Sequence, residues 1–324
     1  MDDITLDPIL QIASGFMAAK FLFVANEFGV FDALKDNPTD LAGLAARAGL
    51  AERSARILAD GCVALGLLHK QGGIYTNSPH ADRFLTGGGL SAGLRFWDVL
   101  SYPAWAHFAA TLAHGPSQQA VELPPEVQQI MLAGIESMLA GPTQVLAATV
   151  DLGCRHRLLD LGCGTGSWST ALLRANQQLT ATLVDLPIAI GATEKHVAGT
   201  GLADRVTVRG ADIRSDPIPT GHDVVMINNV IHYFSPEDNR GLLARVSDVV
   251  SPGALLIAAD FWTDPTHTEP VPAALMAGEF AAHIAEGDVY SLDEITSWLE
   301  VTGWEVDRHQ SLAGPQSAVL ARRT

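Results

Sequence analysis

Cysteine, basic residues and long apolar runs are all scarce in this sequence of 324 residues. The three cysteines (Cys62, Cys154 and Cys163) include no CxxC pair, so neither a disulfide framework nor a structural zinc site is expected. Lys and Arg number 20 against 36 Asp and Glu, and the resulting formal charge of −16 repels the phosphates of nucleic acids. No uninterrupted run of about 18 apolar residues occurs, and Met1-Asp2-Asp3 is acidic where a secretory signal is basic. These absences, with 48% hydrophobic residues, predict a cytoplasmic globular enzyme with no membrane span.

Residues 1–85 predict a helical module in the order of a winged helix. Apolar residues recur every three or four positions from Ile9 to Phe23, which indicates a helix with one apolar face. Two further helices joined at Gly49 precede a tight turn at Gly72-Gly73 and a short strand. Through His80 the formal charge is −3, which disfavours a DNA-binding transcription regulator and favours an apolar packing or dimerisation module.

The pattern of the remaining sequence changes at about residue 150, from mainly helical segments to alternating strands and helices. Residues 86–150 are mainly helical and rich in aromatic residues and methionine, which usually form core but also line clefts for flat apolar ligands. From Arg157 onward, short apolar runs alternate with segments of helix length, which predicts an α/β domain over residues 151–324 with a doubly wound parallel sheet. The expected strands are 158–161, 181–185, 206–208, 224–227 and 254–259.

The most informative motif is a glycine-rich loop that follows the first predicted strand. Gly162, Gly164 and Gly166 allow the backbone to approach a ligand closely, and Asp160 stands just before them. Asp185 ends the next strand, where a carboxylate can bind both hydroxyls of a ribose. A nicotinamide site prefers the pattern GxGxxG and a pyrophosphate, which Asp160 would repel. The pattern GxGxG with two acids suits a nucleoside that carries a sulfonium and an amino group.

This segment resembles motif I of class I S-adenosylmethionine-dependent methyltransferases. Together with the N-terminal module, the whole chain is similar to the small-molecule O-methyltransferases of the plant caffeate and bacterial natural-product type. The resemblance implies a Rossmann-like catalytic domain, an N-terminal winged-helix dimerisation domain, a homodimer and a small-molecule acceptor. It also implies S-adenosyl-L-methionine as cofactor, with S-adenosyl-L-homocysteine as product. The cofactor residues that it implies are Asp160, Gly162, Gly164, Gly166, Asp185, Leu186, Asp212, Ile213 and Asn228.

His232 is the candidate general base. It follows the fourth predicted strand, at the edge of the sheet where ligand crevices form, and the family carries its general base there. The family typically continues with Asp-Trp, whereas this chain continues with Tyr233-Phe234, a departure that bears on the substrate and the mechanism. Asp260 and Glu286 are alternative acids that could orient the imidazole. The substrate pocket is predicted to include Trp97, Trp105, Met131, Met138, Met276, Phe280 and His283.

Other readings of the same residues stay open. His232, His283 and Asp260 could in principle form a site with two histidines and one carboxylate for a metal, but their spacing does not require one, and no metal is expected. The same scaffold could transfer a methyl group to carbon or nitrogen, or retain the cofactor in a non-methylating enzyme such as a cyclase. The leading prediction is O-methylation of a small aromatic or polyketide-type natural product.

Overall fold

The computed structural model describes residues 4–116 and 124–324, and the chain forms two compact units. One unit comprises residues 1–103 and 122–138, and the other comprises residues 104–121 and 139–324. The predicted helical region, residues 86–150, is divided between these two units, and residues 117–123 of it lie outside the described residues. The first unit contains α1 (Asp7–Glu27), α2 (Val30–Leu34), α3 (Leu41–Ala48), α4 (Glu52–Ala64), β1 (Leu68–Gln71), β2 (Ile74–Asn77), α5 (Pro79–Phe84), α6 (Ser91–Phe96) and the π-helix η1 (Trp97–Ser101).

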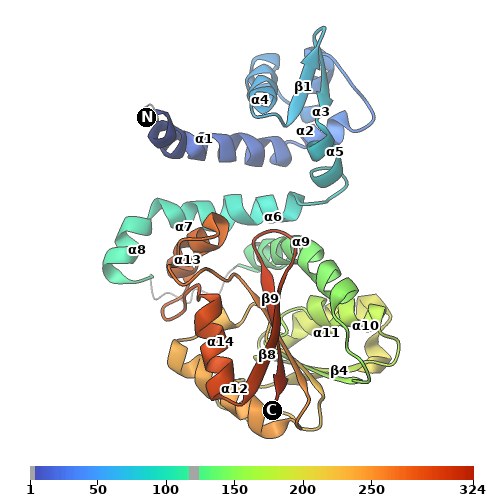
Figure 1. Cartoon of the computed structure of the whole chain (residues 1–324). Coiled ribbons are helices and arrows are strands. Elements are labelled where there is room, and N and C mark those ends of the chain that lie inside the picture. Colours follow the sequence, from blue (N-terminus) through green and yellow to red (C-terminus); the bar gives the residue numbers. More distant parts are fainter. Residues whose placement is uncertain (1–3, 117–123) are drawn as a thin grey trace. The chain divides into compact units, whose positions relative to one another are not determined.

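The N-terminal unit has the predicted order of helices followed by a hairpin (Figure 1). Asp40 accepts a hydrogen bond from the Gly43 amide and caps α3, and the hairpin turns at Gly72 and Gly73, both with positive φ. Phe31, Leu44 and Tyr75 are among the buried residues of its core.

The helix α1 leaves part of its apolar surface uncovered within its own unit. Ile9, Ile12 and Phe16 are exposed, Ile12 by 83% of its surface. By length and composition alone, α1 and α9 (Pro125–Thr149) could each cross a membrane. This is weak evidence for a span because apolar core helices satisfy the same criterion.

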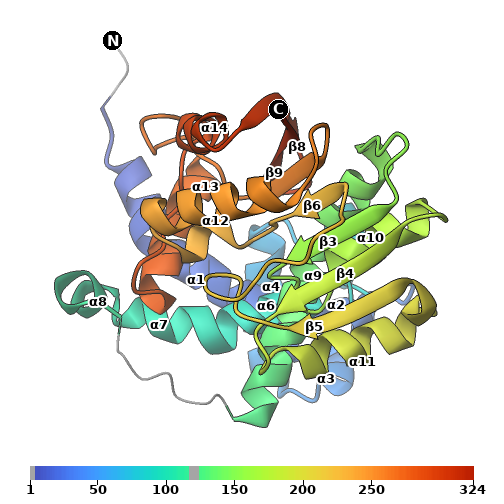
Figure 2. The same cartoon turned by 90° about the horizontal axis from the view of Figure 1, so that it is seen from below.

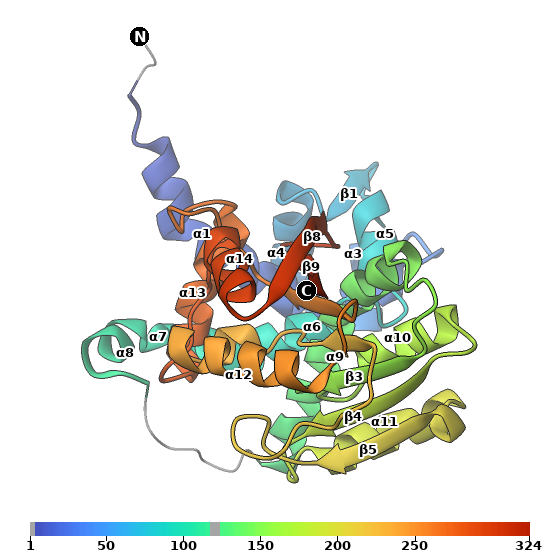
Figure 3. The same ribbon diagram turned by 60° about the horizontal axis from the view of Figure 1, so that its bottom comes forward.

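The second unit is built around a seven-stranded, mostly parallel sheet of order β5-β4-β3-β6-β7-β9-β8. Figures 2 and 3 show β3, β4 and β5 side by side. The predicted strands are confirmed, and the structure adds an antiparallel pair, β8 and β9, that the sequence analysis did not predict. The strands are β3 (Arg157–Leu161), β4 (Thr180–Asp185), β5 (Val206–Gly210), β6 (Val224–Met226), β7 (Leu255–Asp260), β8 (Trp304–Ser311) and β9 (Ser317–Arg323).

Helices cover both faces of this sheet, as a doubly wound fold requires. One hydrophobic cluster joins the sheet to α10 and α11, and another joins its opposite face to α12 and α14. The helical elements that lie wholly or partly in this unit are α7 (Tyr102–Ala106), α8 (Phe108–His114), the end of α9, α10 (Ser167–Ala175), α11 (Ile190–Thr200), η2 (Ala203–Arg205), η3 (Ile231–Tyr233), α12 (Pro236–Val249), α13 (Val271–His283) and α14 (Leu292–Val301). This order places the carboxyl ends of β3, β4, β6 and β7 along one edge of the sheet, where the predicted site residues lie.

Candidate functional site

The glycine loop between β3 and α10 has a conformation that side chains would disrupt. Gly162, Gly164 and Gly166 all have positive φ, a region that other residues rarely adopt. A Cβ on Gly162 would lie 2.4 Å from Val230 Cγ2, and one on Gly166 would lie 2.7 Å from Leu183 Cδ2. A Cβ on Gly164 would instead meet open space. Gly162 and Gly166 are therefore needed for packing, whereas Gly164 leaves its backbone open to a ligand.

Two carboxylates flank this loop in different environments. Asp185 is partly exposed at the end of β4, and its carboxylate accepts hydrogen bonds from the amides of Gly164 (2.6 Å) and Leu186 (2.7 Å). Asp160 is only 1% exposed, and its carboxylate accepts a hydrogen bond of 2.6 Å from Ser169 Oγ. Burial raises the pKa of the Asp160 carboxyl to about 7, with a further increase from the charge of Asp185 and an opposing effect of the Ser169 hydrogen bond. A nearby positive charge would stabilise the ionised form of Asp160.

The other predicted cofactor residues lie at the ends of β4, β5 and β6. Leu186 is exposed after Asp185, and Asp212 orders the loop after β5, where it accepts a hydrogen bond of 2.8 Å from the Arg214 amide. Ile213 is buried beside it. Asn228 is also buried, and its side-chain oxygen accepts a hydrogen bond of 2.8 Å from the Ala259 amide. Asn228 thus braces β6 against β7, and its contact with a cofactor stays a prediction.

His232 and Asp260 meet at the carboxyl edge of β6 and β7. His232 lies in η3, several residues beyond the end of β6, and Asp260 is the last residue of β7. Their side chains are buried, with 2.7 Å between His232 Nδ1 and Asp260 Oδ1. The Asp260 carboxylate also accepts hydrogen bonds from the amides of His232 (3.3 Å) and Phe261 (2.9 Å). These contacts favour the tautomer with the proton on Nδ1, which leaves Nε2 able to accept one.

Aromatic rings and a glycine hold His232 in place. The Phe280 ring stacks on the imidazole with 3.9 Å between centroids and 3° between planes, and the Tyr233 ring lies 4.4 Å away. A Cβ on Gly287 would lie 1.8 Å from the carbonyl oxygen of His232, so the loop before α14 packs directly on the backbone of His232. The imidazole is therefore constrained by its acid partner, its ring neighbours and its own backbone.

The alternative acid and the alternative metal ligands lie elsewhere. Glu286 is exposed, and Asp260 is the acid in contact with His232 Nδ1. His283 pairs with Glu279, with 3.3 Å between His283 Nε2 and Glu279 Oε1. Across residues 4–116 and 124–324, no group of three His, Cys, Asp or Glu side chains is arranged to hold a metal ion.

The predicted substrate-pocket residues belong to both units. Trp105, Met276, Phe280 and His283 are in the second unit, where a Cβ on Gly278 of α13 would lie 2.6 Å from Trp105 Cη2. The other three, Trp97, Met131 and Met138, are in the first unit. The pocket as a whole stays a prediction.

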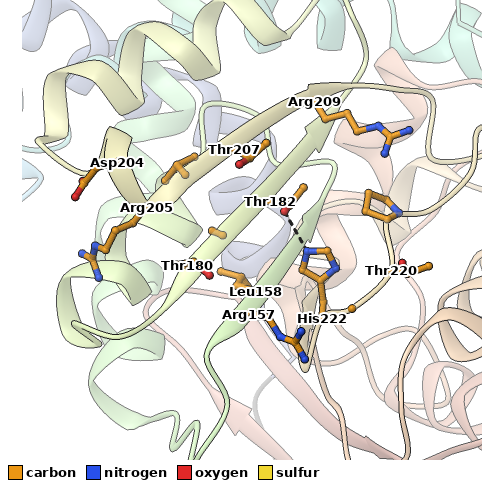
Figure 4. A pocket seen from close by; sticks show the side chains of 14 residues that line it. Arg157, Leu158, Thr180, Thr182, Asp204, Arg205, Thr207, Arg209, Thr220 and His222 are labelled. Atoms are coloured by element: carbon orange, nitrogen blue, oxygen red, sulfur yellow. Dashed lines mark hydrogen bonds between the residues drawn. The ribbon is translucent and has the colours of Figure 1, made fainter.

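A cavity of about 660 Å³ lies at the opposite, amino end of β3, β4 and β5 (Figure 4). Thr182 and His222 meet there, with 3.0 Å between Oγ1 and Nε2. The Arg205 guanidinium on its wall donates hydrogen bonds to four backbone carbonyls and so stabilises the fold. This cavity is separate from the predicted site, because the glycine loop, Asp185 and Asp260 all lie at the carboxyl ends of the strands.

Comparison with known families decides how this site is classified. A model of the O-methyltransferase domain matches residues 108–305, and a model of the O-methyltransferase dimerisation domain matches residues 10–87. The chain belongs to the O-methyltransferase family. It is thus an S-adenosylmethionine-dependent methyltransferase, and the predictions of family, enzyme class and cofactor are confirmed.

Similar proteins span nearly the whole chain. The tetracenomycin polyketide synthesis 8-O-methyltransferase TcmO of Streptomyces glaucescens is 29% identical, over 97% of this chain and 96% of the relative. The 3-hydroxy-5-methyl-1-naphthoate 3-O-methyltransferase of Streptomyces sahachiroi is 28% identical, over 95% and 92%. The crystal structure of the S-adenosylmethionine-dependent methyltransferase SibL in its apo form is 28% identical, covers 98% of this chain and 99% of its own, and has a TM-score of 0.85.

Relatives named for transfer to other atoms match about as well. The L-tyrosine C(3)-methyltransferase of Streptomyces lavendulae is 27% identical over 96% of this chain and 90% of the relative. The N,N-dimethyltransferase OxyT of Streptomyces rimosus is 28% identical over 92% and 90%. Membership of the O-methyltransferase family therefore leaves the acceptor atom to be argued from the site.

The residues of this methyltransferase fit its cofactor. S-adenosylmethionine carries a sulfonium and an ammonium group, whose positive charges suit a site with two carboxylates, Asp160 and Asp185. The open space at Gly164 leaves room for close approach to the backbone. When bound, the cofactor supplies an electrophilic methyl group.

Sequence reasoning missed three neighbours of the site. Ser169 contacts Asp160 from the first turn of α10, Gly287 packs on His232, and Glu279 accepts a hydrogen bond from Trp105. Ser169 follows the glycine loop closely enough that its place at the start of α10 could have indicated it. Gly287 and Glu279 carry no motif, because their contacts depend on how distant segments pack.

Proposed function

We propose that this methyltransferase transfers the methyl group to a hydroxyl of a small aromatic or polyketide-type natural product, with His232 as general base. The observation that carries the proposal is the buried contact of 2.7 Å between His232 Nδ1 and Asp260 Oδ1. A phenol has a pKa near 10 and reacts with a methyl donor far better as the phenolate, so a positioned base is useful. Asp260 favours the tautomer in which Nε2 can take the phenolic proton.

Orientation contributes as much as proton removal in this reaction. A methyl transfer is an in-line displacement that requires the acceptor oxygen to be aligned with the donor. His232 is held by Asp260 on one nitrogen and by Phe280 on one face of its ring. A fixed Nε2 can orient the hydroxyl through a hydrogen bond before it accepts the proton. Asp260 fixes and stabilises the imidazole, whereas Glu286 is exposed.

The relatives support an aromatic hydroxyl acceptor. TcmO is named for 8-O-methylation in tetracenomycin polyketide synthesis, and the relative from Streptomyces sahachiroi is named for a hydroxynaphthoate. The Phe280 ring, which stacks on His232, suits a flat apolar acceptor, and the predicted pocket residues Trp105 and Met276 would extend this apolar surface.

A homodimer is part of the proposal. The match to a dimerisation domain and the exposed apolar side chains of α1 support it, because an apolar helix face of this kind is stabilised by burial against a second subunit. A cytoplasmic location is proposed because Cys62, Cys154 and Cys163 are all free thiols, as is usual in a reducing compartment.

The acceptor atom is tested with cofactor labelled with ¹³C at its methyl group. The purified protein is incubated with phenols, hydroxynaphthoates, amines and amino acids, and the products are examined by NMR. We expect the label at a carbon shift typical of a methyl ether, with one equivalent of S-adenosylhomocysteine formed. Label on nitrogen or carbon alone would contradict the proposed acceptor, and turnover without S-adenosylhomocysteine would indicate a non-methylating enzyme.

A further inference from the structure

The Phe280 ring determines the plane in which the His232 imidazole lies. Their centroids are 3.9 Å apart and their planes differ by 3°, so one face of the imidazole is covered. Phe261 contacts the Phe280 ring edge-on, with 5.8 Å between centroids and 64° between planes. Asp260 fixes the position of Nδ1, whereas rotation of the ring about that contact is limited by Phe280. The direction of Nε2 therefore depends on where α13 places Phe280.

Little of α13 is fully buried in the core of the unit. Of the 13 residues of this helix, Ala273 is the one buried residue, and the apolar side chains of Val271 and Leu275 are exposed in this chain. Helix rotation is normally set by an apolar stripe packed against the core. The side chain of Phe280 extends about 5 Å from the helix axis, so a rotation of about 20° would move its ring by about 2 Å. Other contacts must hold α13 in register.

Trp105 supplies such contacts at the two residues that precede Phe280. A Cβ on Gly278 would lie 2.6 Å from Trp105 Cη2 and 3.2 Å from Phe108 Cζ, so the indole packs directly on the helix backbone. Trp105 Nε1 donates a hydrogen bond of 2.6 Å to Glu279 Oε2. The other carboxylate oxygen of Glu279 lies 3.3 Å from His283 Nε2, one turn further along the same helix.

Consecutive residues of an α-helix point in directions about 100° apart. With Gly278 packed on the indole and Glu279 bonded to it, the rotation of α13 is fixed at two adjacent positions. These two contacts therefore determine the direction in which the Phe280 side chain points. We infer that Trp105 and Glu279 are positioning residues of the catalytic site, which lock α13 so that Phe280 holds the His232 imidazole in its reactive orientation. This inference rests on the proposed role of His232 as the base.

A spectroscopic experiment tests the geometry without reference to activity. Histidine labelled with ¹³C and ¹⁵N is incorporated, and the ring signals of His232 are identified by their loss in His232→Gln. A ring stacked at 3.9 Å shifts the imidazole protons upfield through its ring current. Phe280→Leu is expected to remove this shift, and Trp105→Phe and Glu279→Leu are expected to reduce it. Glu300→Leu, at an exposed position of α14, is the matched control and leaves it unchanged.

A double-mutant cycle on turnover tests the functional consequence. Trp105→Phe keeps an aromatic ring but removes the N–H donor, and Glu279→Leu removes the acceptor. Because a hydrogen bond to a charged group is lost in each, kcat is expected to fall about tenfold in either variant, with cofactor affinity unchanged. The double variant is expected to lose about tenfold as well, since the two residues act through one contact. Glu279→Gln, whose amide oxygen still accepts the indole proton, is expected to stay within about threefold of the wild type.

The outcomes separate this inference from the proposed function. Unchanged His232 ring shifts in both Trp105→Phe and Glu279→Leu would overturn the positioning role. Additive losses of kcat in the double-mutant cycle would also overturn the positioning role, because the two residues would then act independently. So would a rise in KM with kcat preserved in Trp105→Phe, because Trp105 would then only line the acceptor pocket. Altered ring shifts with full turnover in these variants would show that this orientation does not matter for catalysis and would overturn the positioning role, whereas full turnover in His232→Gln would refute His232 as the base. Circular dichroism and cofactor binding verify that each variant is folded.

Discussion

The buried carboxyl of Asp160 predicts that cofactor binding is coupled to pH. Its pKa is raised to about 7, because burial disfavours the charged form and the charge of Asp185 adds to the effect. The positive charges of S-adenosylmethionine favour the ionised carboxylate, so binding is expected to release a proton from Asp160. A group with a pKa near 7 in the free protein is mostly protonated at pH 6 and mostly ionised at pH 8. One pKa unit corresponds to a factor of ten, so we expect affinity at pH 6 to be about tenfold lower than at pH 8.

Isothermal titration calorimetry measures this coupling directly. Titrations at pH 6, 7 and 8 in buffers of different ionisation enthalpy give both the affinity and the number of protons released. Asp160→Asn is expected to bind the cofactor weakly and with no dependence on pH over this range. Ser169→Ala removes the hydrogen bond that lowers the pKa of Asp160, and so is expected to move the dependence to higher pH. An affinity that is constant between pH 6 and pH 8, without proton release, would refute the reasoning.

Three further predictions concern the base, the loop and the dimer. Asp260→Asn is expected to lower kcat by about 10²-fold or more in steady-state assays, because an amide favours the wrong tautomer of His232; full activity would contradict the role of this acid. Gly164→Ala and its control Gly201→Ala both place a side chain at positive φ in open space, so each is expected to cost about 1 kcal/mol of stability in denaturant unfolding. Only Gly164→Ala is expected to weaken cofactor binding, by at least about tenfold, and equal affinities in the two variants would contradict the placement of the cofactor. Ile12→Asp is expected to shift the protein from dimer to monomer in light scattering, and an unchanged mass would contradict a dimer interface on α1.

The sheet could be predicted where each strand is a continuous apolar run. The strands β3, β4, β6 and β7 are buried between helices, so their sequences show little polar interruption. The strand β8 has the sequence WEVDRHQS and lies at the edge of the sheet, where polar residues are tolerated, and it gave no comparable signal. Its antiparallel partner β9 does carry a buried apolar run over residues 318–321, which the sequence analysis overlooked.

The candidate site could be predicted in part for a similar reason. His232 follows β6 and Asp260 ends the adjacent parallel strand β7, so their meeting at one edge follows from the topology. The sequence could not decide between Asp260 and Glu286, because both come after His232 in the chain. The structure was needed to show which of them contacts the imidazole. The contact between Trp105 and Glu279 joins residues 174 positions apart and depends on how α13 packs on a separate segment. No local pattern carries that information.

The role of His232 is tested most directly by single-turnover transfer of a labelled methyl group to a phenolic acceptor. His232→Gln is compared with the wild type at saturating cofactor and acceptor, and cofactor affinity is measured on the same samples. We expect the rate of methyl transfer to fall at least about 10²-fold with cofactor affinity unchanged. Transfer to the phenolic oxygen at the wild-type rate in His232→Gln would contradict the assignment of His232 as the base.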